Sequence, residues 1–198
     1  MTPAVDLDSQ LMLSVQRDDA RSFGVLLDRN RQVVLHYLTR MVRNEAIAEE
    51  LAQEVFLRVY RSRRTYTPAA KFSTWLYRIA TNVAMNHFRD EKRRRQNVVL
   101  SIGKAFSDVH REPVDIAPLV EDLLVGDALA ALVRQAVREL PPKQRAAVIL
   151  HKYDELDYRQ IAKILRTTPA AVKALMFRAY ESLRARLGRR FPARRHKS

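Results

Sequence analysis

The fold is decided by residues 157–180, DYRQIAKILRTTPAAVKALMFRAY, which predict two short helices joined by a tight turn. Asp157 precedes an apolar stripe at helical spacing and is followed by Gln160 at the right distance for a capping box. Thr168 followed by Pro169 predicts the start of the second helix, because a threonine hydroxyl caps free amides and proline fits the first helical position. This pattern is typical of a helix-turn-helix.

The second of these helices has a buried side and a charged side. Its expected buried residues are Val172, Leu175, Met176 and Ala179. The residues left outside are Lys173, Phe177, Arg178 and Arg184. A helix with such a face fits the major groove of duplex DNA. Any small helical hairpin also buries a stripe and leaves charges in water, so this segment alone does not decide between the two interpretations.

Composition supports a nucleic-acid partner and a helical fold. The 198 residues carry a net charge of +14, with a pI of about 10.6, which predicts attraction to phosphates. A hydrophobic content of 47% is enough for ordinary buried cores, so the chain is not a disordered basic tail. There are 4 glycines and few alternating strand-like runs. We therefore expect an all-α fold, with two small helical domains joined by a flexible linker.

The absence of cysteine excludes disulfides and thiolate metal sites. The first residues are acidic rather than a basic stretch followed by an apolar one, and no run approaches the length of a membrane span. We expect a cytoplasmic protein without membrane insertion.

Hydrophobic periodicity divides the chain into two helical regions. The helices that we expect cover residues 6–17, 20–43, 46–63, 72–94, 121–139 and 142–153, followed by the helix-turn-helix. A loop over 64–71 is indicated by Pro68. Gly103, Pro113 and Pro118 interrupt the pattern further along. The expected organisation is a first domain over 1–95, a linker over 96–120, a second domain over 121–190 and a basic tail over 191–198.

The helix expected from Phe72 carries an unusual face opposite its core stripe. Its members follow one another at steps of three and four and are Trp75, Arg78, Asn82, Asn86, Arg89 and Arg93. Amides can bond base edges, guanidiniums pair with phosphates and an aromatic ring stacks on unpaired bases. This face suits a single-stranded nucleic acid. The alternative is that Trp75 belongs partly to the core and that the arginines form a solvated face.

The preceding helix carries an acidic ridge within Ala48-Glu-Glu-Leu-Ala-Gln-Glu-Val-Phe. Its members are Glu49, Glu50, Leu51, Gln53 and Glu54. Carboxylates repel DNA, so this ridge with its apolar neighbours indicates a protein partner. A solvated face with a weak Glu54–Arg58 pair remains an equal alternative on physical grounds.

Taken in this order, the segments resemble the extracytoplasmic-function sigma factors of bacterial RNA polymerase. The resemblance extends over about 23–95 and 127–187. Its strongest motifs are AEELAQEVF at 48–56, FSTWLYRIATN at 72–82, Leu140-Pro141, and the helix-turn-helix at 157–180. One helix-turn-helix is weak evidence, because repressors of many kinds share it, whereas the four motifs together are specific.

The resemblance implies partners and roles. It implies that core RNA polymerase is bound by the acidic ridge, that the promoter −10 element is read by Lys71 and the asparagine-bearing face, and that the −35 duplex is read by Lys173, Phe177 and Arg178. An anti-sigma factor is a further possible partner in such a family. The sequence departs from the family pattern at Arg166, where the turn usually carries glycine, and at Ala174, Leu175 and Tyr180. Arg166 must therefore avoid a left-handed conformation or accept a modest strain.

The functional prediction is a sigma factor that directs promoter-specific initiation. One alternative is a helix-turn-helix transcriptional regulator that acts without polymerase, which leaves the acidic ridge and the paired asparagines unused. A second alternative is a DNA-processing enzyme with Glu49, Glu50 and Glu54 as metal ligands. Those carboxylates lie along one outward helix face without a cluster of histidine or aspartate. We therefore expect no enzymatic activity, no metal and no cofactor.

Overall fold

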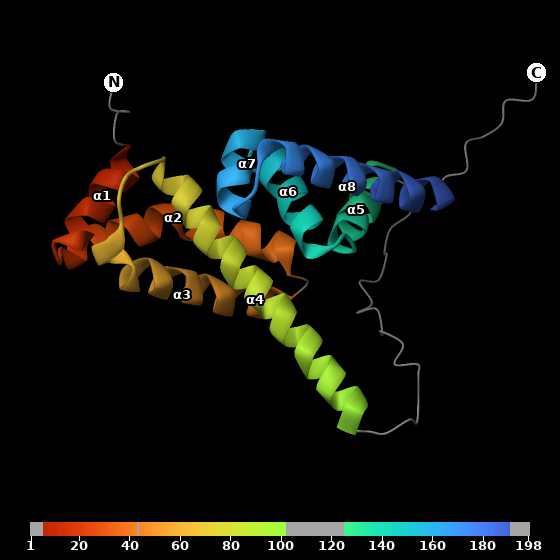
Figure 1. Ribbon diagram of the computed structural model, residues 1–198, viewed down its shortest axis with the longest axis horizontal. Coiled ribbons are helices and arrows are strands. Elements are labelled where there is room, and N and C mark those ends of the chain that lie inside the picture. Colours follow the sequence, from red (N-terminus) through yellow and green to blue (C-terminus); the bar gives the residue numbers. More distant parts are fainter. Residues whose placement is uncertain (1–5, 43, 102–124, 191–198) are drawn as a thin grey trace, which may run out of the picture.

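The computed structural model describes residues 6–42, 44–101 and 125–190, and these residues are helical throughout apart from short turns (Figure 1). No strand occurs in these ranges. The all-α prediction is confirmed. Among the described helices, none combines the length and the apolar character needed to cross a bilayer.

The first group of helices consists of α1 (Leu7–Gln16), α2 (Ala20–Met41), α3 (Glu45–Arg61), the 3-10 turn η1 (Arg63–Thr65) and α4 (Phe72–Ser101). Each of the first three helices begins at a side chain that accepts bonds from free backbone amides. These caps are Asp6, Asp19 and Asn44. The 3-10 turn overlaps the start of the segment 64–71, which was expected to be a loop.

Helix α4 packs against α2 and α3, and its core stripe closes the first domain. The largest fully buried side chains here are Met12, Leu26, Tyr37, Leu38, Met41, Phe72 and Leu76. The Tyr37 hydroxyl pairs with Thr81 Oγ1 at 2.8 Å, which satisfies both buried groups. Ile79, expected in the core stripe, is only partly buried but packs against the core.

Helix α4 is longer than the sequence analysis predicts. It continues to Ser101, whereas the helix expected from the sequence ends at about residue 94. Residues 102–120 of the expected linker lie outside the described residues. The physical reason is that the first helix-breaking residue after Arg95 is Gly103, and two β-branched valines lower helix propensity only slightly. The C-terminal end of α4 projects past the other helices in Figure 1.

The second group consists of α5 (Val125–Arg138), α6 (Pro142–Lys152), α7 (Tyr158–Leu165) and α8 (Pro169–Arg190). Residues 121–124 and the tail over 191–198 lie outside the described residues. The largest fully buried side chains are Leu140, Ile149, Leu150, Ile161 and Ile164. They come from α6, α7 and the turn after α5, so the short helix α7 is held mainly by packing.

The starts of α7 and α8 confirm the predicted caps. The Asp157 carboxylate accepts from Gln160 N at 2.8 Å, and Gln160 Oε1 accepts from Asp157 N at 2.9 Å. Thr168 Oγ1 accepts from Ala171 N at 3.1 Å. Arg166 adopts the left-handed conformation, with φ 50° and ψ 56°. Of the two outcomes expected without glycine, the chain takes the strained one.

The two groups of helices lie against each other. Helix α7 packs on α4, and α6 packs on both α2 and α4. In Figure 1 the α6–α7 pair lies beside the C-terminal half of α2 and the first half of α4. Arg145 on α6 donates from Nη1 to the carbonyl oxygen of Met41 at the end of α2, and the Tyr77 hydroxyl of α4 donates to Asp154 Oδ1 at 2.8 Å. The sequence analysis made no prediction of this arrangement.

Candidate nucleic-acid and protein interfaces

The asparagine-bearing face of α4 is a mixture of exposed and half-buried side chains. Asn82, Arg89 and Arg93 are exposed, whereas Arg78 and Asn86 are half-buried. Asn86 Oδ1 accepts a hydrogen bond from Arg89 Nη2 at 3.1 Å, so the amide is held in one orientation. The face therefore presents amide and guanidinium donors on a rigid helix, as the spacing predicts.

Trp75 is held in an aromatic cluster at the start of α4. Its ring lies 4.9 Å from Tyr66 in an edge-to-face arrangement and 5.6 Å from Phe72. The side chain is half-buried, which agrees with the alternative that it belongs partly to the core. Because two neighbours already contact the indole, only the exposed part of the ring can meet a base.

The loop that precedes α4 is fixed by α1. Asp6 Oδ2 accepts from Phe72 N at 3.2 Å, and Gln16 Nε2 donates to the carbonyls of Arg64 and Tyr66. Partial burial acts to raise the pKa of the Asp6 carboxyl, but hydrogen bonds from Ser9 and Phe72 outweigh it and hold this pKa below its ordinary value. The loop that ends at the exposed Lys71 is therefore positioned before any ligand arrives.

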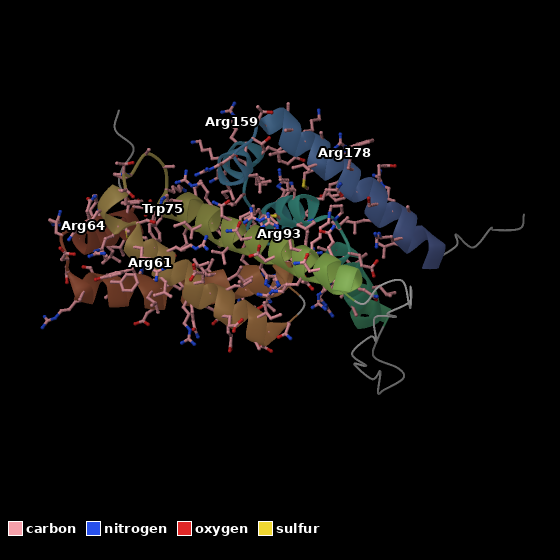
Figure 2. The ribbon with its side chains drawn as sticks, turned by 60° about the horizontal axis from the view of Figure 1, so that its bottom comes forward. Arg61, Arg64, Trp75, Arg93, Arg159 and Arg178 are labelled. Carbon is pink, nitrogen blue, oxygen red and sulfur yellow. The ribbon has the colours of Figure 1, made fainter. Side chains whose placement is uncertain are left out.

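Arginines at the end of α3 extend this basic surface and were missed by the sequence analysis. Arg61 and Arg64 are exposed, and Figure 2 shows both at the end of the first domain that also carries Trp75. Arg64 is 73% exposed and its Nη2 lies 3.7 Å from Asp18, a weak pairing. The run RSRR at 61–64, directly before the loop, is the signal that could have found them.

Helix α8 presents its predicted face openly. Lys173, Phe177, Arg178 and Arg184 are all exposed, and Phe177 is 65% exposed. Arg184 pairs with Glu181 on the same helix at 2.9 Å. The Phe177 ring therefore lies in solvent on the same face as these cations, where a ligand can reach it. On the opposite side the predicted core residues are buried except Leu175, which is only partly buried.

Arg159 on α7 adds a cation to this side of the second domain. It is exposed, and Figure 2 shows it with Arg178 on the outer side formed by α7 and α8. The sequence analysis did not single it out, although it directly follows the capping box residue and Tyr158. It widens the surface that can meet phosphates.

The acidic ridge on α3 is mostly exposed. Glu49, Glu50 and Gln53 are exposed, whereas Leu51 and Glu54 are half-buried. Glu54 Oε1 accepts from Arg58 Nε at 2.6 Å, one helical turn away. The exposed carboxylates of Glu49 and Glu50 are not part of this ion pair. Among the residues that the structure describes, no group of three acidic, histidine or cysteine side chains is arranged to hold a metal ion.

An apolar groove of about 620 Å³ runs beside this ridge, between α2 and α3. Glu49 and Gln53 form part of its rim. Its apolar lining includes Phe23, Leu27, Leu35, Phe56, Leu57 and Tyr60. Leu57 and Tyr60 in this lining are 50% and 41% exposed, so the groove belongs to an exposed apolar patch and not to the closed core. The sequence analysis missed the groove because its two walls come from different helices.

Two regions of the chain match known families. Residues 26–94 match the family described as sigma-70 region 2, and residues 130–183 match the family described as sigma-70, region 4. The first match contains the acidic ridge and most of the α4 face. The second contains α7 and most of α8.

Whole-length relatives share this order. The chain is 32% identical to RNA polymerase sigma-H factor of Pseudomonas aeruginosa, over 89% of this chain and 91% of the relative. It is 35% identical to RNA polymerase sigma factor CarQ of Myxococcus xanthus, over 87% and 93%. It is 32% identical to ECF RNA polymerase sigma factor SigW of Bacillus subtilis, over 87% and 92%.

Solved structures share the fold. CnrH, solved in complex with the cytosolic domain of CnrY, superimposes with a TM-score of 0.65 at 19% identity, over 92% of this chain and 97% of CnrH. The sigma factor RpoE of Bartonella quintana, solved with the anti-sigma factor NepR, gives a TM-score of 0.59 at 21% identity, over 85% and 98%.

Proposed function

We propose that the two domains of the chain divide promoter recognition between them. The proposal proceeds from the finding that the chain belongs to the extracytoplasmic-function family of RNA polymerase sigma factors. The domain over 1–95 binds core RNA polymerase and captures the melted −10 element. The domain over 121–190 holds the −35 element as a duplex. The observation that carries this proposal is the presence of two separate basic faces, one on α4 and one on α8, together with the acidic ridge on α3 and the apolar groove beside it.

The −10 element is assigned to the α4 face and the loop before it. The residues are Lys71, Trp75, Arg78, Asn82, Asn86, Arg89 and Arg93. Opening one base-pair step costs about 1.4 kcal/mol on average. Stacking and pocket contacts return ~1 to 3 kcal/mol for each captured base. Few captured bases are therefore enough to nucleate melting, and the pre-positioned loop lowers the entropy cost of capture.

The −35 element is assigned to the exposed face of α8. Lys173, Arg178 and Arg184 supply cations for phosphates or for guanine edges, and Phe177 offers an apolar surface that suits a thymine methyl group. Arg159 on α7 lies on the same side and adds a phosphate contact. The helix is firmly seated, since Val172, Met176 and Ala179 are buried behind it.

Core polymerase is assigned to Glu49, Glu50, Leu51, Gln53 and Glu54, together with the groove between α2 and α3. The acidic ridge borders the groove on the α3 side, whereas Arg31 lines it on the α2 side. In a chain of net charge +14, exposed carboxylates beside an apolar groove favour a partner surface that offers cations next to apolar side chains. The apolar floor supplies the buried area, and the carboxylates supply orientation. An anti-sigma factor is a further partner in this proposal, because RpoE, whose fold is similar, was solved bound to one.

The protein acts by binding and not by catalysis in this proposal, and it works in the cytoplasm, where template DNA and polymerase meet. If the protein were a helix-turn-helix regulator that acts without polymerase, the acidic ridge and the paired asparagines would have no role. Copurification with core polymerase separates these two functions.

The test is transcription reconstituted from sigma-free core polymerase and the purified chain on a library of promoter fragments. The expected result is initiation from a subset of fragments that share two sequence elements. Failure to direct initiation from any fragment, with the same core enzyme active when given another sigma factor, would contradict the proposed function.

A further inference from the structure

A chain of hydrogen bonds connects α1 to the loop before α4. The Tyr66 hydroxyl donates to Ser9 Oγ at 2.9 Å, and Ser9 Oγ donates to Asp6 Oδ2 at 3.0 Å. Tyr66 and Ser9 are 2% and 1% exposed, so water does not compete for the bond between them. A hydroxyl buried in this way is costly unless it has an acceptor. The bonds therefore fix the Tyr66 side chain relative to α1.

The protonation states at the two ends give this chain of bonds a fixed direction. Burial raises the pKa of the Tyr66 hydroxyl above its ordinary value, so the hydroxyl stays protonated and donates. The pKa of the Asp6 carboxyl is lowered, so the carboxylate stays ionised and accepts. The same oxygen, Oδ2, also accepts from Phe72 N at 3.2 Å. One carboxylate therefore holds both Tyr66, through Ser9, and the first residue of α4.

Both residues held in this way are neighbours of Trp75. The centre of the Tyr66 ring lies 4.9 Å from the indole in an edge-to-face arrangement, and the centre of the Phe72 ring lies 5.6 Å from it. The two neighbours are also 6.1 Å from each other, so the three rings form one cluster. In Figure 1 the segment between α3 and α4 passes alongside α1. The orientation of the half-buried indole is thus set from α1 through its two neighbours.

Helix α1 is itself firmly seated. Met12 in its middle is fully buried in the core of the first domain. At its C-terminal end, Gln16 Nε2 donates to the carbonyls of Arg64 and Tyr66 at 3.0 and 3.3 Å. The loop is therefore held by α1 at both of its ends. The supporting residues come before residue 26, where the match to sigma-70 region 2 begins, so that match assigns them no role.

We propose that Asp6, Ser9 and Tyr66 form a positioning relay that presents the indole of Trp75 to an unpaired base of the −10 element. This inference rests on the proposed function and adds α1 to the elements that capture the melted strand. The relay acts through Trp75 and needs no contact of its own with DNA. An indole that is already oriented loses little freedom when a base stacks on it, so more of the stacking energy appears as affinity. A loosened relay should weaken base capture and leave phosphate contacts unchanged.

Trp75 is the single tryptophan of the chain, so intrinsic fluorescence reports on this ring alone. Tyr66→Phe removes the hydroxyl and keeps the ring, and Ser9→Ala removes the acceptor. Tyr37→Phe is the matched control, because Tyr37 also bonds a buried hydroxyl of the first domain, Thr81, but packs on a different aromatic ring. Acrylamide should quench the fluorescence of both relay variants more strongly than that of the unchanged protein. It should quench the control to the same extent as the unchanged protein.

Base capture is measured on the complex of the full chain with core polymerase. The probes are two labelled single strands of equal length. One covers the −10 element of a promoter from which the unchanged chain initiates, and the other has the same backbone without bases. Fluorescence anisotropy should show that the relay variants bind the base-bearing strand roughly fivefold or more weakly, the lower end of what one stacked base contributes. Affinity for the strand without bases should stay the same, since its phosphates meet the same cations.

The double variant Ser9→Ala/Tyr66→Phe separates positioning from stability. Ser9→Ala alone leaves the buried Tyr66 hydroxyl without its acceptor, whereas the double variant removes both partners of the bond. The free energy of unfolding should therefore recover in the double variant, as measured by urea unfolding. Base capture should remain as weak as in the single variants, because the ring is still not held.

Base capture that recovers together with stability in the double variant overturns the relay. Relay variants that cannot be distinguished from Tyr37→Phe, in quenching or in base capture, overturn it as well. If the unchanged chain initiates from promoters and the relay variants behave as the control does, the relay fails and the proposed function stands. If the unchanged chain initiates from no promoter, the proposed function fails, and the role of the relay in it fails too.

Discussion

The α4 face and the α8 face differ in how far their side chains stand out of the protein. On α8 every assigned side chain is exposed, and the helix is seated on a separate row of buried residues. On α4 half of the assigned side chains are exposed and half are half-buried, and Trp75 packs against Tyr66 and Phe72. A duplex needs a protruding rigid helix that enters a groove, whereas an unpaired base needs recesses between side chains that are already held. The exposed side chains of α8 suit the first requirement, and Trp75 and Asn86, which are already held by neighbours, suit the second.

The largest effect is expected from Asn82→Ala combined with Asn86→Ala, which tests whether the α4 face binds unpaired bases. If the amides bond unpaired bases, their loss costs about 2 kcal/mol or more, which is roughly a 30-fold decrease in open-complex formation. Permanganate reactivity of promoter thymines measures melting, and affinity for core polymerase is measured in parallel. We expect unchanged affinity for the core enzyme. Loss of both properties together would contradict the assignment of roles.

The acidic ridge on α3 belongs to neither DNA face. Charge reversal on the ridge tests whether it binds polymerase independently of the two DNA faces. Glu50→Lys with Glu54→Lys should weaken core polymerase binding by at least about tenfold, since charges at a protein interface are converted from attractive to repulsive. Circular dichroism should show an unchanged fold. A control with the same change in net charge is Asp28→Lys with Glu155→Lys, at exposed positions outside the ridge. Normal core affinity in the ridge variant would reject the docking surface.

Phe177→Ala tests whether the α8 face contacts a base of the −35 duplex. We expect roughly a tenfold loss of affinity for a −35 duplex, because one good base contact contributes about 1–3 kcal/mol. Replacing thymine by uracil in the duplex removes the methyl group alone. It should weaken binding of the unchanged protein and have no further effect on Phe177→Ala. Equal sensitivity of both proteins to uracil would exclude the methyl contact.

Asp6→Ala tests the support behind the α4 face. It removes the cap of α1 and the bond to Phe72 N, and should lower the free energy of unfolding of the first domain by about 1 kcal/mol at neutral pH. Because the folded pKa of Asp6 is depressed, its stabilisation is present above the ordinary value of 3.8 and is lost as the pH falls through the folded pKa. Urea unfolding at pH 7 and pH 3 measures the difference between the two proteins. A difference of equal size at both pH values would contradict this role of the carboxylate.

Arg166→Gly is the smallest test and concerns the support behind the α8 face. Arg166 is left-handed, with φ 50°, and glycine adopts this conformation without a steric cost. The substitution should stabilise the second domain by about 0.5–1 kcal/mol, measured as a higher thermal midpoint. A lower midpoint would show that contacts of the Arg166 side chain stabilise the domain by more than its left-handed backbone conformation destabilises it.

The parts of the structure that local chemistry controls were predictable. Asp157, Gln160, Thr168 and Pro169 specify where α7 and α8 begin, because each acts on backbone groups within one turn. The end of α4 was predicted too early, since no breaking residue marks it before Gly103. Partial exposure could not be predicted either, because it depends on which neighbour covers a side chain. Trp75 shows this, since Tyr66 comes from the preceding loop.

Features assembled from distant segments could not be predicted at all. The groove takes one wall from α2 and the other from α3, and no spacing within one helix reveals that they face each other. The same holds for the contact of Tyr77 with Asp154, which are far apart in the sequence. For these features the sequence shows only single residues. Leu57 is an example, because its exposure is known only from the structure.

The bond from Arg145 to position 41 ends on a main-chain oxygen, and this has an evolutionary consequence. Every amino acid that can replace methionine there provides the same acceptor, so drift at that position leaves the bond in place. Only a change at the arginine can abolish it. We therefore expect natural variation in this contact to arise in the α6 residue and not in its acceptor.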